Sequence, residues 1–137
     1  MKVRNAIIMA GVLIVASLPA LAHHSFAAEY DANNQITLNG TVSKFDWVNP
    51  HARLYMDVKG ANGKTTPWEL ECGNITSLQR HGWKRDTLKP GDAIVVTGYA
   101  AKDGSNVGAA STIKTPEGKR FFVGSTTDGS PQPEPDK

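Results

Sequence analysis

The chain has 137 residues, of which 39% are hydrophobic and 20% charged, which is enough for one small domain with a modest core. Its formal charge is +2, but Lys2 and Arg4 fall in a leader without acidic residues, so the remainder is close to neutral. A neutral chain lacks the basic excess that attracts nucleic acid, and we expect no nucleic-acid partner.

The first segment, residues 1–22, is typical of a secretory signal peptide. A basic start is followed by an apolar run from Ala6 to Leu18, and Ala20-Leu21-Ala22 has the small-x-small pattern of a cleavage site. The run is shorter than the roughly 20 apolar residues of a membrane-spanning helix. We therefore expect cleavage after Ala22, no stable membrane anchor afterwards, and a protein outside the cytoplasm that is periplasmic or secreted.

The remaining chain divides by composition into an arm, a folded body and a tail. Residues 23–34 lack a strong periodic pattern and predict an irregular N-terminal arm, whereas residues 35–124 hold the apolar periodicity of the folded domain. Residues 125–137 are rich in Pro, Ser, Asp and Gly and contain no large hydrophobic residue. Such a segment cannot bury enough apolar surface to fold, so it predicts a disordered tail.

The first half of the body is predicted to form three strands. Residues 35–47 form a long strand that Gly40 interrupts, which indicates a bulge or a sharp coil. Residues 52–58 alternate between apolar and polar side chains, as in a strand with one buried face. The Asn62-Gly63 pair suits a hairpin turn, and residues 65–71 form the return strand.

The second half is predicted to contain a short helix and further strands. Asn74 is a suitable N-cap for a helix that ends at Gly82. Strands are expected at residues 93–101 and 107–115, and a short last strand at residues 120–123.

Three strands, a helix, two strands and a small extra strand are typical of an all-β fold with one short helix. This order, with a long glycine-interrupted first strand, predicts an OB-like five-stranded barrel plus a short extra strand. Closing the sheet also removes exposed strand edges. A six-stranded sandwich and an SH3-like barrel are the alternatives.

Several short motifs stand out along the chain after the leader. They are His23-His24-Ser25-Phe26, Glu29-Tyr30, Leu38-Asn39-Gly40-Thr41-Val42, Trp47-Val48-Asn49-Pro50-His51-Ala52, Trp68-Glu69-Leu70-Glu71, Gly82-Trp83, Leu88-Lys89-Pro90-Gly91-Asp92 and Gly98-Tyr99-Ala100-Ala101-Lys102-Asp103-Gly104. With these motifs the chain resembles a family of small exported bacterial proteins of unknown function. The resemblance implies export and a small β-barrel, and it supplies no activity, substrate or catalytic residue.

The histidines suggest a copper site. A mature chain that begins at His23 would offer its amine and ring Nδ1 to one metal ion, and a further imidazole would complete a three-nitrogen plane that suits Cu(II). His51, in the loop after the first strand, is the expected further ligand, with His24 as an alternate. Binding should weaken below about pH 6, where these nitrogens take up protons. The alternative is that all three histidines are structural or merely polar.

Three further residues, Asp46, Met56 and Cys72, are weaker candidate ligands for that ion. Cys72 is the only cysteine, so no disulfide can form within the chain. We expect a small buried side chain at a strand end, with a reactive or intermolecular thiol as the alternative.

A second candidate site is a binding surface beside the His51 loop. Its predicted ligand-binding residues are Trp47, Asn49, His51, Arg53 and Tyr55. A wider set of aromatic residues could line the same face, with core packing as the alternative for each: Trp47, Tyr55, Trp68, Trp83 and Tyr99.

An enzyme is the least favoured reading. The chain has no Gly-x-Ser-x-Gly elbow, His-Glu-x-x-His helix or glycine-rich phosphate loop. Glu69 and Glu71 share one strand face about 7 Å apart, a spacing that permits acid–base work but is also common among surface residues. We therefore expect a binding or accessory protein with an unknown small molecule or periplasmic protein as partner. A copper-binding protein using His23, His24 and His51 is the alternative.

Overall fold

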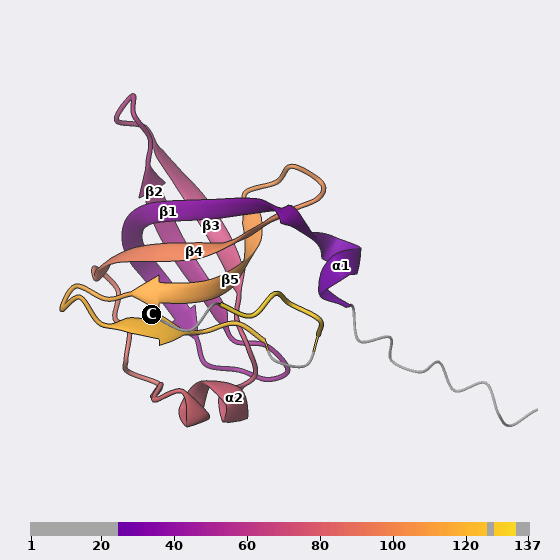
Figure 1. Ribbon diagram of the computed structural model, residues 1–137. Coiled ribbons are helices and arrows are strands. Elements are labelled where there is room, and N and C mark those ends of the chain that lie inside the picture. The colour runs from indigo at the N-terminus through magenta and orange to yellow at the C-terminus, as the bar shows by residue number, and fades with distance from the viewer. Residues whose placement is uncertain (1–24, 126–127, 134–137) are drawn as a thin grey trace, which may run out of the picture.

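The computed structural model describes residues 25–125 and 128–133 (Figure 1). The predicted leader and the two histidines at positions 23 and 24 lie outside these residues. The elements in chain order are α1 (Phe26–Glu29), β1 (Tyr30–Asp46), β2 (Arg53–Lys59), β3 (Thr65–Glu71), α2 (Ile75–Arg80), β4 (Ala93–Ala101), β5 (Val107–Lys114) and β6 (Arg120–Phe122).

The strands form one sheet that closes on itself. Their order is β3-β2-β1-β4-β5-β6, and a parallel pairing between β3 and β5 completes a ring of hydrogen bonds through five strands. The short β6 is added to β5 outside this ring. This arrangement confirms the predicted all-β, OB-like fold with a short extra strand. It differs from the prediction in having a second short helix, α1.

Gly40 allows β1 to serve two neighbours at once. It pairs with Val58 of β2 and with Ile94 of β4, at the point where β1 passes from one partner to the other. A Cβ atom at this position would lie 2.2 Å from the carbonyl oxygen of Asp57. Only glycine fits there, because the neighbouring backbone comes so close. The register shift of the β1–β2 pairing lies between Val42 and Lys44 and not at Gly40 itself.

The hydrophobic core lies inside the ring of strands. Leu54, Met56 and Leu70 are fully buried, because the alternation along β2 and β3 turns every second side chain inward. Trp83 is also buried, and its ring nitrogen donates a hydrogen bond to the carbonyl of Phe122 at 2.8 Å. Helix α2 closes one end of the ring, seen at the bottom of Figure 1.

The predicted N-cap of this helix is confirmed. The Asn74 side chain accepts a hydrogen bond from the backbone N–H of Ser77 at 2.8 Å. The helix gives way to Gly82, which has a positive φ of 86°.

The N-terminal segment is more regular than its sequence pattern indicates. Strand β1 begins at Tyr30 rather than at Gln35, and α1 precedes it. The reason is tertiary packing, because Phe26 and Tyr30 are buried in a small outer cluster with Ala109, against which Tyr99 packs. The Phe26 ring lies 5.5 Å, centroid to centroid, from both tyrosine rings.

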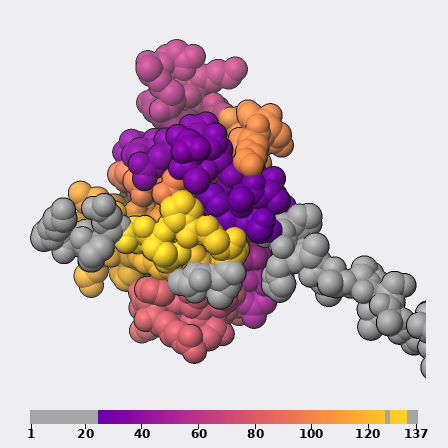
Figure 2. All heavy atoms as spheres, turned by 45° about the vertical axis from the view of Figure 1, so that its right-hand side comes forward, coloured from indigo at the N-terminus to yellow at the C-terminus, as the bar shows by residue number. Residues whose placement is uncertain are grey.

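The C-terminal segment returns to the same side of the molecule. The backbone N–H of Phe26 donates a hydrogen bond to the carbonyl of Asp128 at 2.9 Å, and Ser125 is buried. Figure 2 shows the indigo N-terminal residues and the yellow C-terminal residues side by side on this face. The two ends of the described chain therefore support each other.

Candidate functional site

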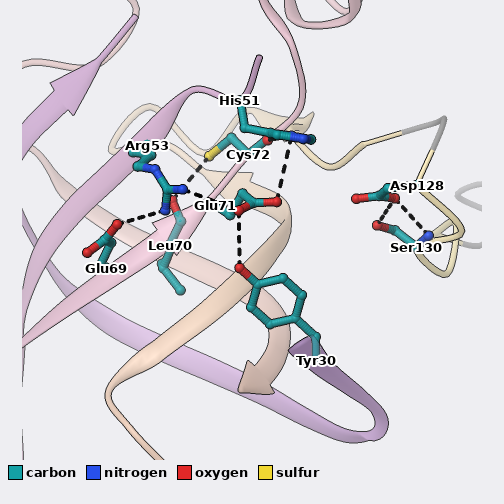
Figure 3. Close-up of polar contacts among 9 residues, drawn as sticks. All are labelled: Tyr30, His51, Arg53, Glu69, Leu70, Glu71, Cys72, Asp128 and Ser130. Carbon is teal, nitrogen blue, oxygen red and sulfur yellow. Dashed lines mark hydrogen bonds and ion pairs between the residues drawn. The ribbon is translucent and has the colours of Figure 1, made fainter. Parts of the chain in front are cut away.

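Polar side chains from three separate segments meet around Glu71 (Figure 3). The Tyr30 hydroxyl donates to Oε2 of Glu71 at 3.3 Å, and Nη2 of Arg53 lies 3.5 Å from the same oxygen. Nδ1 of His51 lies 3.7 Å from Oε1. We call Tyr30, His51, Arg53 and Glu71 the Glu71 corner. It joins the start of β1, the β1–β2 loop with the start of β2, and the end of β3.

The hairpin register places Arg53 beside the two carboxylates of β3. Arg53 is the direct cross-strand partner of Glu71, and its Nη1 lies 2.7 Å from Oε1 of Glu69. The Glu71 side chain is only 15% exposed, whereas those of Arg53 and Glu69 are 38% and 37% exposed. A carboxylate as buried as Glu71 needs such partners, because an unpaired buried charge is strongly unfavourable.

Burial and charge shift the pKa values of two groups in the corner. Burial of the Tyr30 hydroxyl, together with the negative charge of Glu71, raises the pKa of Tyr30 well above its usual value. Burial of Arg53 acts against its charge, but Glu71 and Glu69 outweigh this effect and hold the pKa of the guanidinium above its usual value. Tyr30 therefore remains a proton donor and Arg53 remains a cation.

The imidazole of His51 is held through one nitrogen. Its Nδ1 lies 3.1 Å from the carbonyl oxygen of Cys72 and 3.7 Å from Oε1 of Glu71, and both of these atoms are acceptors. Nδ1 therefore carries the proton of the neutral ring, which leaves a lone pair on Nε2. A histidine with its proton on Nδ1 is the tautomer that can bind a metal ion through Nε2. The His51 side chain is 21% exposed.

The loop that carries His51 is fixed on both sides. Asn49 accepts a hydrogen bond at 3.1 Å from the backbone N–H of Ile75, at the start of α2. Ala52 exchanges backbone hydrogen bonds with Gly73 and Cys72. The position of His51 is thus set by β3 and α2 rather than by the loop alone.

The five predicted ligand-binding residues do not all lie together in the structure. His51 and Arg53 come together in the Glu71 corner. Trp47 packs against Phe45 and the core, while Asn49 is the exposed residue that holds α2. Tyr55 is half-buried on the same outer face as Arg53, and Nζ of Lys44 lies 5.4 Å from its ring centroid.

The wider aromatic set does not share one face. Trp83 lies in the hydrophobic core and Trp68 packs against that core, whereas Tyr99 packs against the outer cluster around Phe26. Packing, the alternative to a binding surface for each ring, therefore accounts for most of them.

No group of three or more histidine, cysteine or acidic side chains in the described ranges is arranged to hold a metal ion. The proposed ligands at positions 23 and 24 lie outside those ranges. Met56 and Cys72 are buried, and Asp46 pairs with Lys44 at 2.9 Å. Burial, with a further effect from Glu71, raises the pKa of the Cys72 thiol to about 12, which agrees with the predicted buried side chain.

Glu69 and Glu71 do lie on one face, but Arg53 bonds to both carboxylates. The two glutamates therefore form a cluster of ion pairs with Arg53.

Among the residues described, no helix is long and apolar enough to cross a membrane.

Sequence reasoning missed Tyr30 as a member of the site and considered Glu71 only together with Glu69. The Arg53–Glu71 pair had a signal, because counting back from the Asn62-Gly63 turn aligns these two residues across the hairpin. Tyr30 had none, since its contact with Glu71 joins residues that are 41 positions apart.

No curated protein and no solved structure matches this chain. A family model, described as a family of unknown function, matches residues 10–110, which is more than half of the chain. The match confirms the resemblance to a family without an assigned activity, and it covers every residue of the Glu71 corner. The chain therefore belongs to this family of unknown function, DUF6152.

Proposed function

We propose that this chain is an exported binding protein and that its binding site is the Glu71 corner with the adjoining β1–β2 loop. The leader supports export, and the lack of a catalytic motif favours binding over chemistry. The observation that carries the proposal is a largely buried carboxylate that Tyr30 contacts from one segment and His51 and Arg53 contact from another, beside an imidazole whose Nδ1 faces two acceptors. OB folds commonly bind ligands at this place, the β2–β3 face and the β1–β2 loop.

The charges of the site favour a small cation as the ligand. Glu69 and Glu71 supply two carboxylates, while Arg53 supplies one guanidinium that pairs with both. One negative charge remains uncompensated beside a free imidazole nitrogen. A divalent metal ion or a small amine matches this combination of negative charge and lone pair.

The test is an NMR titration of the isotope-labelled mature protein with Cu(II), Zn(II) and 1,4-diaminobutane in turn. We expect one of these probes to shift or broaden the signals of Tyr30, His51 and Arg53 until saturation. His51→Ala should abolish the effect. His81→Ala is the matched control, because His81 also bonds through Nδ1 to a backbone carbonyl, that of Ser77, but lies at the end of α2. Effects that map elsewhere, or that survive in His51→Ala, would refute the proposed site.

A second candidate function, copper binding by His23, His24 and His51, is favoured by the anchoring of the N-terminal segment. Phe26 is buried and bonded to Asp128, and its ring packs on Tyr30, whose hydroxyl touches Glu71. His23 and His24 lie outside the described residues, and they precede Phe26 by three and two positions in the sequence. The anchoring of Phe26 favours a site that joins the amine and ring of His23 to Nε2 of His51, with His24 as an alternate ligand.

Native mass spectrometry of untagged protein purified from a bacterial periplasm tests export and copper binding together. We expect a mass that begins at His23 and carries one copper ion. One extra residue before His23, or His51→Ala, should release the copper, whereas His81→Ala should retain it. A mature mass that binds no added copper, or copper retained after the extension, would exclude the copper site. A mass that includes residues 1–22 would exclude cleavage.

A further inference from the structure

A group of four exposed cations lies at the end of α2 and in the loop that follows. Residues 80–89 contain Arg80, Lys84, Arg85 and Lys89 against one acidic residue, Asp86. No ion pair joins any of the four to another residue of the described chain. The rest of residues 25–133 holds eight cations and ten acidic residues. Positive charge is therefore concentrated in one segment of a chain that is otherwise slightly acidic.

Buried anchors fix this segment against the ring of strands. Trp83 and Leu88 are both buried in the hydrophobic core. Between them, the hydroxyl of Thr87 accepts a hydrogen bond from the N–H of Lys84 at 2.8 Å, and the N–H of Thr87 donates to the carbonyl of Lys84 at 3.1 Å. The cationic side chains thus project from an ordered backbone, so little main-chain freedom is lost when they bind a partner.

The one large hydrophobic side chain that is exposed among the described residues lies at the same end of the molecule. It is Val48 in the β1–β2 loop, at 47% exposure. Its neighbour Asn49 accepts a hydrogen bond from the N–H of Ile75 at the start of α2, and this helix reaches Arg80 within about 9 Å. Figure 1 shows the loop beside α2 at the bottom of the view. We call this group the α2 surface: Val48, Arg80, Lys84, Arg85 and Lys89.

We propose that the α2 surface binds reversibly to an anionic phospholipid bilayer, a function beyond the small-ligand binding proposed above. Lysine and arginine side chains close to a membrane are attracted by its negative head groups. An exposed apolar side chain beside them can enter the boundary between head groups and acyl chains. An acidic protein would match the four cations equally well, and the exposed Val48 is what favours the bilayer. Binding through this end would turn the β2–β3 hairpin, at the top of Figure 1, away from the membrane.

The experiment measures co-sedimentation of the mature protein, without residues 1–22, with lipid vesicles at low salt. Vesicles of phosphatidylglycerol and phosphatidylcholine in equal parts should bind the protein, and vesicles of phosphatidylcholine alone should not. Lys84→Gln/Arg85→Gln should weaken binding about 10-fold or more, because each cation near a charged membrane contributes about fivefold. Lys59→Gln/Lys64→Gln is the matched control, since it removes two exposed lysines from the β2–β3 hairpin, and it should change binding by no more than about twofold.

Two further variants test the surface independently of that loop position. Arg80→Gln/Lys89→Gln should weaken vesicle binding as much as the first pair, because these cations flank it in the same segment. Val48→Ser should weaken it about threefold, because about half of this side chain is available for transfer out of water.

Three outcomes would overturn the proposal. The first is a wild-type protein that does not bind the anionic vesicles. The second is a loss in the hairpin control as large as that in Lys84→Gln/Arg85→Gln, which would mean that net charge alone drives binding. The third is binding to poly-glutamate as tight as to the vesicles, with no effect of Val48→Ser on either, which would identify an acidic macromolecule as the partner. None of these results bears on the Glu71 corner, because the variants leave its residues unchanged.

Discussion

Replacing Arg53 by alanine should destabilise the protein, because it leaves Glu71 without its cationic partner. Removing one partner of a fully buried ion pair costs about 3–5 kcal/mol, whereas an exposed pair contributes at most about 1 kcal/mol. Glu71 is 15% exposed and Arg53 is 38% exposed, so this pair lies between the two limits. We expect the free energy of unfolding to fall by about 2 kcal/mol, and Tm to fall by roughly 10 °C for a domain of this size.

Urea denaturation followed by tryptophan fluorescence measures this loss. The double variant Arg53→Ala/Glu71→Gln removes both charges, so its loss should be smaller than the sum of the two single losses by about 1 kcal/mol. The corresponding cycle with Glu69→Gln should show a coupling of about 0.5 kcal/mol or less, because Glu69 is exposed to solvent.

A loss below about 0.5 kcal/mol in Arg53→Ala would contradict this reasoning. It would mean that water or another group satisfies Glu71 as well as the guanidinium does. A coupling with Glu69 as large as that with Glu71 would refute the distinction between the two carboxylates. In that case Glu71 would have no special place in the proposed site.

Three further predictions concern the fold and the buried groups around the site. Gly40→Ala should lower the free energy of unfolding by more than about 2 kcal/mol in urea denaturation, because its Cβ would lie 2.2 Å from the carbonyl oxygen of Asp57. The control is Gly63→Ala, where φ is +76° but nothing lies within 4 Å of the added Cβ. This change should lower the free energy of unfolding by only about 1 kcal/mol. At pH 8 a thiol reagent should modify Cys72 only in denatured protein, because burial raises its pKa to about 12, and rapid labelling of native protein would contradict this. Folding raises the pKa of Tyr30, so its contribution to stability is complete below about pH 10 and is lost as the pH rises further. Tyr30→Phe should therefore lose less stability than the wild type between pH 9 and 11. Parallel curves of unfolding free energy against pH for the two proteins would refute this.

The parts of the fold that depend on local patterns could be predicted closely. Strands β3 and β4 have the predicted bounds, because each combines an alternating pattern with a turn that marks its end. Gly40, which interrupts the predicted first strand, lies where β1 passes from pairing with β2 to pairing with β4. These signals are local in the sequence, and together they were sufficient to indicate the closed OB-like sheet.

The candidate site could be predicted only in part, because its members are joined by long-range packing. Tyr30 lies in a polar stretch that shows no periodicity, and its burial depends on contacts with distant residues, Glu71 and Ala109. The same holds for Asp128, whose carbonyl accepts the N–H of Phe26 although its segment is rich in turn-forming residues. Neither contact leaves a trace in composition or spacing.

The contrast between local and long-range contacts also distinguishes the Glu71 corner from an ordinary strand surface. The β2–β3 hairpin alone brings Arg53 to Glu71 and would form a charged strand face of an ordinary kind. What distinguishes the corner is that the start of β1 and the His51 loop both contact the same carboxylate. If the site served only stability, Arg53 would suffice to satisfy Glu71, and the hydroxyl of Tyr30 and the ring of His51 could be replaced without consequence for binding. Variants at these two positions, measured for both unfolding and copper affinity, therefore separate a structural charge cluster from a binding site.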